Sequence, residues 1–348
     1  GGTGGNSGLE SGNGGSGGTA TASAQVTNNG IFNDFLYNSH TSTVWAAGGS
    51  GGNGSSNGSS GGAGGVASIL PITVTFAGGG HVAARQTGGA GGSGSHGADG
   101  GNGADSHLDN VISGSAVGLL HLRQEANGGD GGRIDSGTAG AAGNAASHLT
   151  ADNPGGGSID GISVATGGRG GDTTGSGNAT NGGTAEGSVN ISGTANVAAR
   201  LDVSGGAGGS TVGFNNPSSN TGNAGHGADA ILVDKTTGAT PESLTLYQSA
   251  NGGGGGGAYG GAAGNGGAAI SKLTHVSSSA TINATTAASG GYGGHKTAGS
   301  GVAGAGGLAD AETNTSSSVG DAHSTAHAYG GAGGSSAGRV EGGAGADA

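Results

Sequence analysis

The chain has 348 residues, of which 94 are glycine, four are proline and none is cysteine or methionine. Apolar residues make up 31% and aromatic residues 3%, so a thick core of the conventional globular kind is excluded. The net charge of −12, without a basic cluster, argues against nucleic-acid binding. No apolar run is long enough for membrane insertion as a helix, and disulfides and thiolate metal sites are excluded.

A five-residue pattern, Gly-Gly-x-Gly-Gly, divides the chain into units of about 40 residues. It starts at residues 1, 48, 88, 128, 167, 205, 252, 290 and 330. A small, mostly apolar residue and then a mostly polar one precede the internal copies, so the flanks keep register as well. We therefore interpret residues 1–348 as a single repeat array rather than as a disordered chain.

Alternating segments between the glycine clusters predict strands with one buried face. Such segments are TATASAQV at 19–26, ITVTF at 72–76 and NVAARLDV at 196–203. Turn signals that divide these stretches occur at 28–30, 78–80, 154–157 and 237–238. Each unit is thus expected to contain two short strands and two glycine segments.

The glycine triplets favour an extended helix of the polyproline II type, which has three residues per turn. Two of every three positions then lack a side chain, so neighbouring segments can approach and bond through their amides. The x positions should point outward, as suits Asp130, Arg169 and Tyr292. Because one unit cannot bury its own apolar face, the predicted fold class is all-β or irregular. It is a stacked solenoid of about eight layers, with strands about 4.8 Å apart.

The alternation of GGxGG clusters with Ala-, Thr- and Ser-rich strands resembles the glycine-rich repeat regions of very large bacterial secreted and cell-surface proteins. These are proteins of the adhesin or extracellular-fibre type. The glycine segments alone are similar to the polyglycine-helix layers of an antifreeze protein and of phage tail-tip adhesins. The resemblance implies a secreted or cell-surface location, and it transfers no catalytic residue.

Three segments approach the nonapeptide G-G-x-G-x-D-x-U-x that binds Ca²⁺ in β-rolls. They lie at 100–108, 224–232 and 342–348, where Asp105, Asp229 and Asp347 would be the calcium ligands. The matches stand about three units apart instead of consecutively, and the alternative is that each Asp bonds a nearby backbone amide. No other cofactor is expected.

Two histidines recur in register, because His107 and His148 each follow Ser and precede Leu. Stacking should bring them close, but two imidazoles are an incomplete metal site. The stretch GGSGG at 48–52 matches the G-x-S-x-G nucleophile elbow without the strand–turn–helix context that the elbow needs. We therefore expect no enzyme.

The expected function is that of a structural extracellular or cell-surface fibre or adhesin-type repeat protein. Its partners would be other copies, further units of the same chain, or surface glycans. The alternative is a ligand-binding solenoid for a glycan, for ice, or for a surface through calcium. Outward positions vary from unit to unit, which disfavours ice binding. Since the chain lacks Met and starts and stops within the repeat, we expect an excerpt of a longer solenoid.

Overall fold

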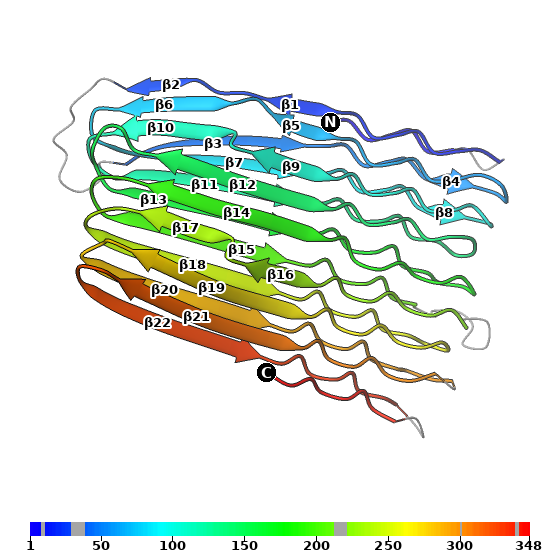
Figure 1. The fold of residues 1–348 in the computed structure, drawn as a ribbon. Helices are drawn as coiled ribbons and strands as arrows, with labels where there is room; N and C mark the ends of the chain where they lie inside the picture. The colour runs from blue at the N-terminus through cyan, green and yellow to red at the C-terminus, as the bar shows by residue number, and fades with distance from the viewer. Residues whose placement is uncertain (8–10, 29–38, 212–220, 300, 338–340) are drawn as a thin grey trace.

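The computed structural model describes residues 1–7, 11–28, 39–211, 221–299, 301–337 and 341–348. Over these residues the chain is all-β, and parallel strands stack into a solenoid of about seven turns of roughly 40 residues each. The predicted fold class is confirmed. Figure 1 shows the strands gathered in one half of the molecule, while the glycine segments run side by side as wavy lines through the other half.

One continuous parallel sheet, which we call the main sheet, receives a strand from every turn. Its strands, in chain order, are β3 (Ser39–Ala47), β7 (Gly79–Thr87), β11 (Leu120–Asn127), β13 (Ile159–Thr166), β15 (Val197–Ser204), β18 (Ser243–Asn251), β20 (Thr281–Ser289) and β22 (Asp321–Tyr329).

The layer that faces the main sheet is also parallel but is divided into smaller sheets. These are β1 (Ala20–Ala22) with β5 (Ala67–Ile69); β2 (Val26–Asn28), β6 (Ile72–Phe76) and β10 (Ile112–Ala116); β9 (Ser106–Asp109), β12 (Ala145–Asp152), β14 (Ala185–Ser192) and β17 (Thr236–Ala239); and β16 (Ala230–Val233), β19 (Ala269–Ser277) and β21 (Ala309–Ser317). Two short strands, β4 (Gly54–Ser55) and β8 (Gly94–Ser95), pair in the glycine half.

Period-two alternation decides which side chains fill the space between the two layers. In β15, Val197, Ala199, Leu201 and Val203 are buried, and the residues between them are not. Because the next strand lies about 4.8 Å away, each buried side chain stacks on its equivalents in the adjacent turns. The core is therefore thin across the molecule but continuous along the stack.

The predicted strands are confirmed, with two corrections to their bounds. The segment 72–76 is β6 and 196–203 is β15 shifted by one residue, whereas 19–26 is interrupted between β1 and β2. The turn predicted at 154–157 is confirmed. The turn predicted at 78–80 is shorter than expected, because Gly79 already begins β7. The turn predicted at 28–30 lies partly outside the described residues. The turn predicted at 237–238 is wrong. Both residues lie in β17, where the free edge of β14 supplies hydrogen bonds that outweigh the turn tendency of Thr-Gly.

The glycine half consists of two layers of extended segments, one leaving the main sheet and one returning to the facing layer. Within a Gly-Gly-x triplet, the N–H of one glycine donates a hydrogen bond to a carbonyl of the opposite layer, as from Gly143 N to Gly129 O at 2.7 Å. The other donates to an x residue of the next turn, as from Gly131 N to Arg169 O at 2.9 Å. Asp130, Arg169 and Tyr292 are exposed, so the prediction that x residues point outward is confirmed.

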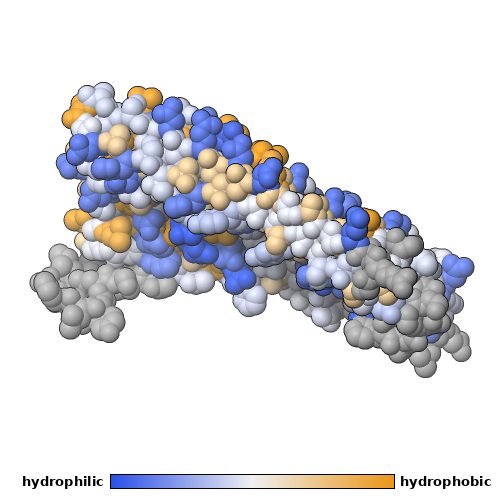
Figure 2. Space-filling model, turned by 90° about the horizontal axis from the view of Figure 1, so that it is seen from below, coloured by the Kyte–Doolittle hydropathy of each residue, from blue (hydrophilic) through white to orange (hydrophobic). Residues whose placement is uncertain are grey.

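The space between the layers becomes polar in the last turn. Thr315 Oγ1 and Ser324 Oγ lie 2.6 Å apart, and Thr313 Oγ1 donates to Thr325 O at 2.7 Å. Figure 2 views the molecule from this end, and the described surface there is mainly hydrophilic or pale, with small scattered hydrophobic groups.

Candidate functional site

The facing layer exchanges its hydrogen-bonding partners at two equivalent breaks. At Asn110, between β9 and β10, φ is 49°, and at Asp234, between β16 and β17, φ is 51°. Asn and Asp adopt this left-handed conformation more readily than most other residues. In both cases the strand before the break pairs with the following turn, and the strand after it pairs with the preceding turn. Each break therefore marks the point where the chain passes from one sheet of the facing layer to another.

A fully buried glutamine from the main sheet compensates for each break. Gln124 Oε1 accepts a hydrogen bond from Val111 N at 2.8 Å, and its Nε2 donates to His148 O at 3.0 Å. Gln248 repeats this arrangement with Lys235 N at 2.9 Å and Lys272 O at 3.0 Å. The glutamine oxygens thus supply acceptors for Val111 N and Lys235 N, while the two carbonyls also accept from Asn110 N and Asp234 N.

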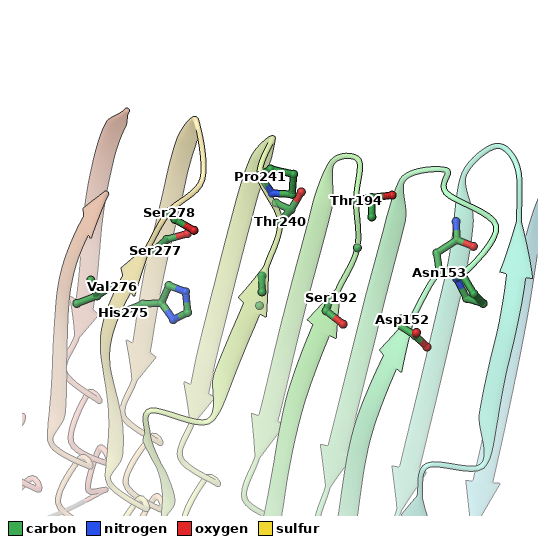
Figure 3. Close-up of a pocket in the computed structure, with 14 residues that line it drawn as sticks. Asp152, Asn153, Ser192, Thr194, Thr240, Pro241, His275, Val276, Ser277 and Ser278 are labelled. Atoms are coloured by element: carbon green, nitrogen blue, oxygen red, sulfur yellow. The ribbon is translucent and has the colours of Figure 1, made fainter. Parts of the chain in front are cut away.

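A groove with a volume of about 640 Å³ crosses the ends of β12, β14, β17 and β19. Figure 3 shows His275 at one end of the row of lining residues and Asp152 towards the other, so the two do not form an acid–base pair. Burial lowers the pKa of His275, while its hydrogen bond with the Gly238 backbone acts in the opposite direction. The groove thus offers one imidazole, favoured in its neutral form, and several hydroxyl groups, but no catalytic pair.

The outward surface of the main sheet carries charged and aromatic side chains on neighbouring turns, and we call it the arginine–histidine face. Its members are Trp45, His81, Arg85, His121, Arg123, Glu125, Asp160, Arg200, Asp202 and Tyr247.

Glu125 is the centre of one network on this face. Arg85 Nε lies 3.2 Å from Glu125 Oε1, and Arg123 Nη2 lies 3.0 Å from Oε2. Asn127 Nδ2 also donates to Oε1, at 3.1 Å. Burial alone would raise the pKa of Glu125, but hydrogen bonds from Asn127 and Arg123 and the charge of Arg85 lower it overall. The carboxylate therefore stays ionised and holds both guanidinium groups in place.

His81, His121 and Asp160 form a second network across three adjacent strands. The two imidazole rings meet edge to face, with centroids 4.3 Å apart, and His121 Nδ1 lies 2.8 Å from Asp160 Oδ2. Burial, followed by the charges of His121 and Arg123, lowers the pKa of His81. Its Nε2 is buried and has no hydrogen-bond partner within the described ranges.

The remaining members are aromatic or lie beside an aromatic ring. Arg200 donates to both oxygens of Asp202, at 2.6 and 3.2 Å, and its Cζ lies 4.6 Å from the centroid of the Tyr247 ring. Trp45 pairs in register with Arg85 and is 65% exposed. Rings and guanidinium groups are thus presented on the outward surface of one parallel sheet.

The predicted calcium ligands lie apart and have other contacts. Asp105 Oδ1 accepts a hydrogen bond from Asn144 N at 2.7 Å, and Asp229 Oδ1 accepts one from Ala268 N at 2.7 Å. This confirms, for Asp105 and Asp229, the alternative that the side chain bonds a backbone amide. The Asp347 carbonyl accepts from Ala309 N at 3.2 Å. No three His, Asp or Glu side chains of the described segments form a group that could hold a metal ion. Calcium binding stays a prediction.

The contact of Asp105 is one instance of a general arrangement, which we call the x ladder. An Asn, Asp or His at an x position accepts a hydrogen bond from the backbone N–H of the x residue one turn further on. Further pairs are Asn53 with Ser93, Asp99 with Thr138, Asn102 with Ala141, Asn144 with Thr184, Asn181 with His226, His226 with Asn265 and His295 with Ser335. Sequence reasoning missed the ladder, although the recurrence of Asn, Asp and His one unit apart indicated it.

The histidine pair and the serine of the elbow-like stretch, which the sequence also singled out, contact neighbouring turns of the stack. The His107 and His148 rings have centroids 6.1 Å apart, which confirms that stacking brings them together, and His148 Nδ1 lies 2.9 Å from Ser188 Oγ. Ser50, in the stretch that matches a nucleophile elbow, is an exposed x residue whose carbonyl accepts from Gly4 N at 2.8 Å.

Neither a protein-family model, nor a curated protein, nor a solved structure matches the chain. No helix long and apolar enough to cross a membrane is found in the part of the chain that the structure describes.

Proposed function

We propose that the chain is a structural repeat segment of an extracellular or cell-surface scaffold and that it has no catalytic site. The x ladder is the observation that carries the proposal. Exposed side chains that could bind a ligand instead bond the backbone of the next turn, as Asp105 does with Asn144. A surface arranged in this way stabilises the stack over its whole length.

The chemistry of the possible sites supports the same proposal. The groove beside His275 lacks an acid–base pair, and the carboxylate of Glu125 is already engaged by two arginines. The absence of cysteine suits a chain that must withstand an oxidising exterior. The partner in this proposal is another copy or further turns of the same chain, because a solenoid gains its stability from neighbouring turns.

Surface labelling of the producing cells tests the proposed location. Antibodies against the folded chain should label intact cells, and protease added outside should remove the label. Matched cells with a permeabilised envelope give the total amount of the chain. Labelling that appears only after permeabilisation would contradict the proposal.

A second candidate function is the binding of a polysaccharide that carries carboxylates, on the arginine–histidine face. Three of the nine Lys and Arg residues of the chain lie on this face, and their positive charges equal in number the negative charges of Glu125, Asp160 and Asp202. The face is therefore neutral, whereas the whole chain has a net charge of −12. The side chains of Arg85 and Arg200 remain 56% and 50% exposed despite their ion pairs. Each guanidinium has five N–H donors in all, so donors are left for hydroxyl and carboxylate groups of a ligand.

The geometry of the face suits an extended sugar chain. Strands succeed one another at about 4.8 Å along the axis, which is close to the length of one pyranose unit. A chain laid along the axis would therefore place about one sugar over each turn. Trp45 offers an exposed ring as a stacking platform at one end, and Tyr247 offers a ring five strands further along the sheet.

The only tryptophan of the chain reports this binding directly. Polygalacturonate should change the fluorescence of Trp45 in a saturable manner, whereas neutral dextran should not. Arg85→Ala should weaken the affinity about tenfold or more, because a hydrogen bond to a charged group contributes about 1.5–3 kcal/mol. Arg169→Ala is the matched control, since Arg169 pairs with Asp172 on the glycine half. No change with polygalacturonate, or equal loss in both variants, would exclude this function.

A further inference from the structure

We infer that Asn57 is a site of spontaneous deamidation, and that the fold protects the other Asn-Gly pairs it describes from the same reaction. The sequence contains Asn-Gly at Asn13, Asn29, Asn53, Asn57, Asn102, Asn127, Asn181, Asn251 and Asn265. The inference does not cover Asn29, because its surroundings lie outside the described residues. It is independent of the proposed function.

The reaction needs a free main-chain nitrogen after the asparagine. That nitrogen attacks the side-chain carbonyl carbon Cγ, a C–N bond forms, and the amide group leaves as ammonia with the proton that the nitrogen loses. Water then opens the resulting succinimide at either carbonyl and gives aspartate or isoaspartate. Glycine promotes the attack because it has no Cβ to hinder the approach of Cγ. A nitrogen whose N–H is held in a hydrogen bond cannot react until the bond opens.

Seven of the pairs have this N–H held by the neighbouring turn, with N–O distances between 2.8 and 3.0 Å. The donors and acceptors are Gly14 to Ser60, Gly54 to Ser93, Gly103 to Ala141, Gly128 to Thr166, Gly182 to His226, Gly252 to Ser289 and Gly266 to Ala305. These bonds belong to the stack itself. To break one of these hydrogen bonds, a turn of the solenoid must open locally, and this opening costs free energy. An asparagine at an exposed loop tip can react without such an opening.

The x ladder fixes the asparagine side chain as well. Ser93 accepts the hydrogen bond of Gly54 N at 2.8 Å, and Ser93 N donates to Asn53 Oδ1 at 3.0 Å. One residue of the next turn therefore holds both the nucleophilic nitrogen and the carbonyl group that it would attack. The same double contact occurs at Asn13, Asn102, Asn181 and Asn265.

Asn57 and Gly58 lie outside this system, at the exposed tip where the glycine segments reverse direction. Ser59 N closes the turn by donating to Ser56 O at 3.2 Å, and Gly58 has φ of 81°. Neither the Asn57 side chain nor Gly58 N has a hydrogen-bond partner among the described residues. Free nitrogen, free side chain and solvent access coincide only at this pair among the eight described Asn-Gly pairs.

Peptide mapping by mass spectrometry tests the inference on the folded, full-length chain in a mildly alkaline buffer. Deamidation in water labelled with ¹⁸O marks the reacted positions. Asn57 should react at least about tenfold faster than Asn53, because opening a stacked turn costs more than about 1.4 kcal/mol. Asn53 is the matched control, since it lies in the same turn and is also followed by glycine.

Denaturation provides the second control. In denaturant all the Asn-Gly pairs should react at similar rates, so the protection is a property of the fold. Asn57→Gln should abolish the fast event in the folded chain without accelerating any other described pair. Equal rates at Asn53 and Asn57 in the folded chain would overturn the inference. A fast reaction at any of the seven held pairs would overturn it too.

Discussion

The side-chain amide of Gln248 donates to the main-chain carbonyl of Lys272 at 3.0 Å, across the core from one sheet layer to the other. Its carbonyl accepts from Lys235 N at 2.9 Å, and the side chain is fully buried. One residue of the main sheet thus satisfies both sides of a break in the facing layer. The side chain thereby supplies an acceptor for Lys235 N at the point where the strand exchanges its partners between turns.

Gln248→Leu should reduce the free energy of unfolding by about 1–3 kcal/mol, because it removes the acceptor of the partly buried Lys235 N–H and the other hydrogen bonds of the buried amide. Urea denaturation followed by circular dichroism measures the change. Gln25→Leu is the control, since Gln25 is exposed and should have almost no effect. Equal stability of Gln248→Leu and the parent chain would show that the break relaxes or admits water.

The period of the glycine clusters was sufficient to predict the stack, and alternation was sufficient to predict strands such as β6 and β15. Both signals are local and repeat in the sequence. The break at Asp234 was missed because it depends on Gln248, which is close in space but belongs to the opposite layer. For the same reason, the arginine–histidine face could not be predicted. Arg85 and Glu125 meet only because adjacent turns align them.

Alanine should discriminate between the two kinds of glycine position. A Cβ at Gly129 would overlap the carbonyl oxygen of Gly89, whereas a Cβ at Gly254 would meet only Tyr292 O, at 3.9 Å. Gly129→Ala should therefore lower the free energy of unfolding by about 1–3 kcal/mol or more, as overpacking does. Gly254→Ala should have little effect, because residue 254 is an x position. Similar thermal melting of the two variants would contradict the packing of the glycine layers.

Stability should decrease as the pH falls through the ordinary imidazole pKa of 6.5. Burial lowers the pKa of both His81 and His275 in the folded chain, with His121 and Arg123 adding to the effect at His81 and Asp160 opposing it. The unfolded chain then binds more protons than the folded chain near that pH, and protonation favours unfolding. Urea midpoints between about pH 7.5 and pH 5.5 measure the dependence.

The double variant His81→Gln, His275→Gln should show a flatter dependence over the same interval. His226→Gln is a suitable control, because His226 is an exposed member of the x ladder. An unchanged slope in the double variant would mean that the acid sensitivity comes from other groups. Glu125 is one such group, since its pKa is lowered and its stabilising contribution is lost at more acidic pH.

The last prediction separates the x ladder from calcium binding at Asp105. Asp105→Asn keeps an oxygen that can accept from Asn144 N but loses the charge that a calcium ion needs, whereas Asp105→Ala loses both. If the ladder is the role of this side chain, Asp105→Ala should lower the free energy of unfolding by about 0.5–1.5 kcal/mol, and Asp105→Asn should change it little. EDTA and added calcium should then leave the melting temperature of all three chains within a few degrees of its starting value. If calcium is bound, EDTA should destabilise the parent chain alone, and Asp105→Asn should be as damaging as Asp105→Ala. Thermal melting of the three chains with EDTA and with calcium therefore decides between the two roles.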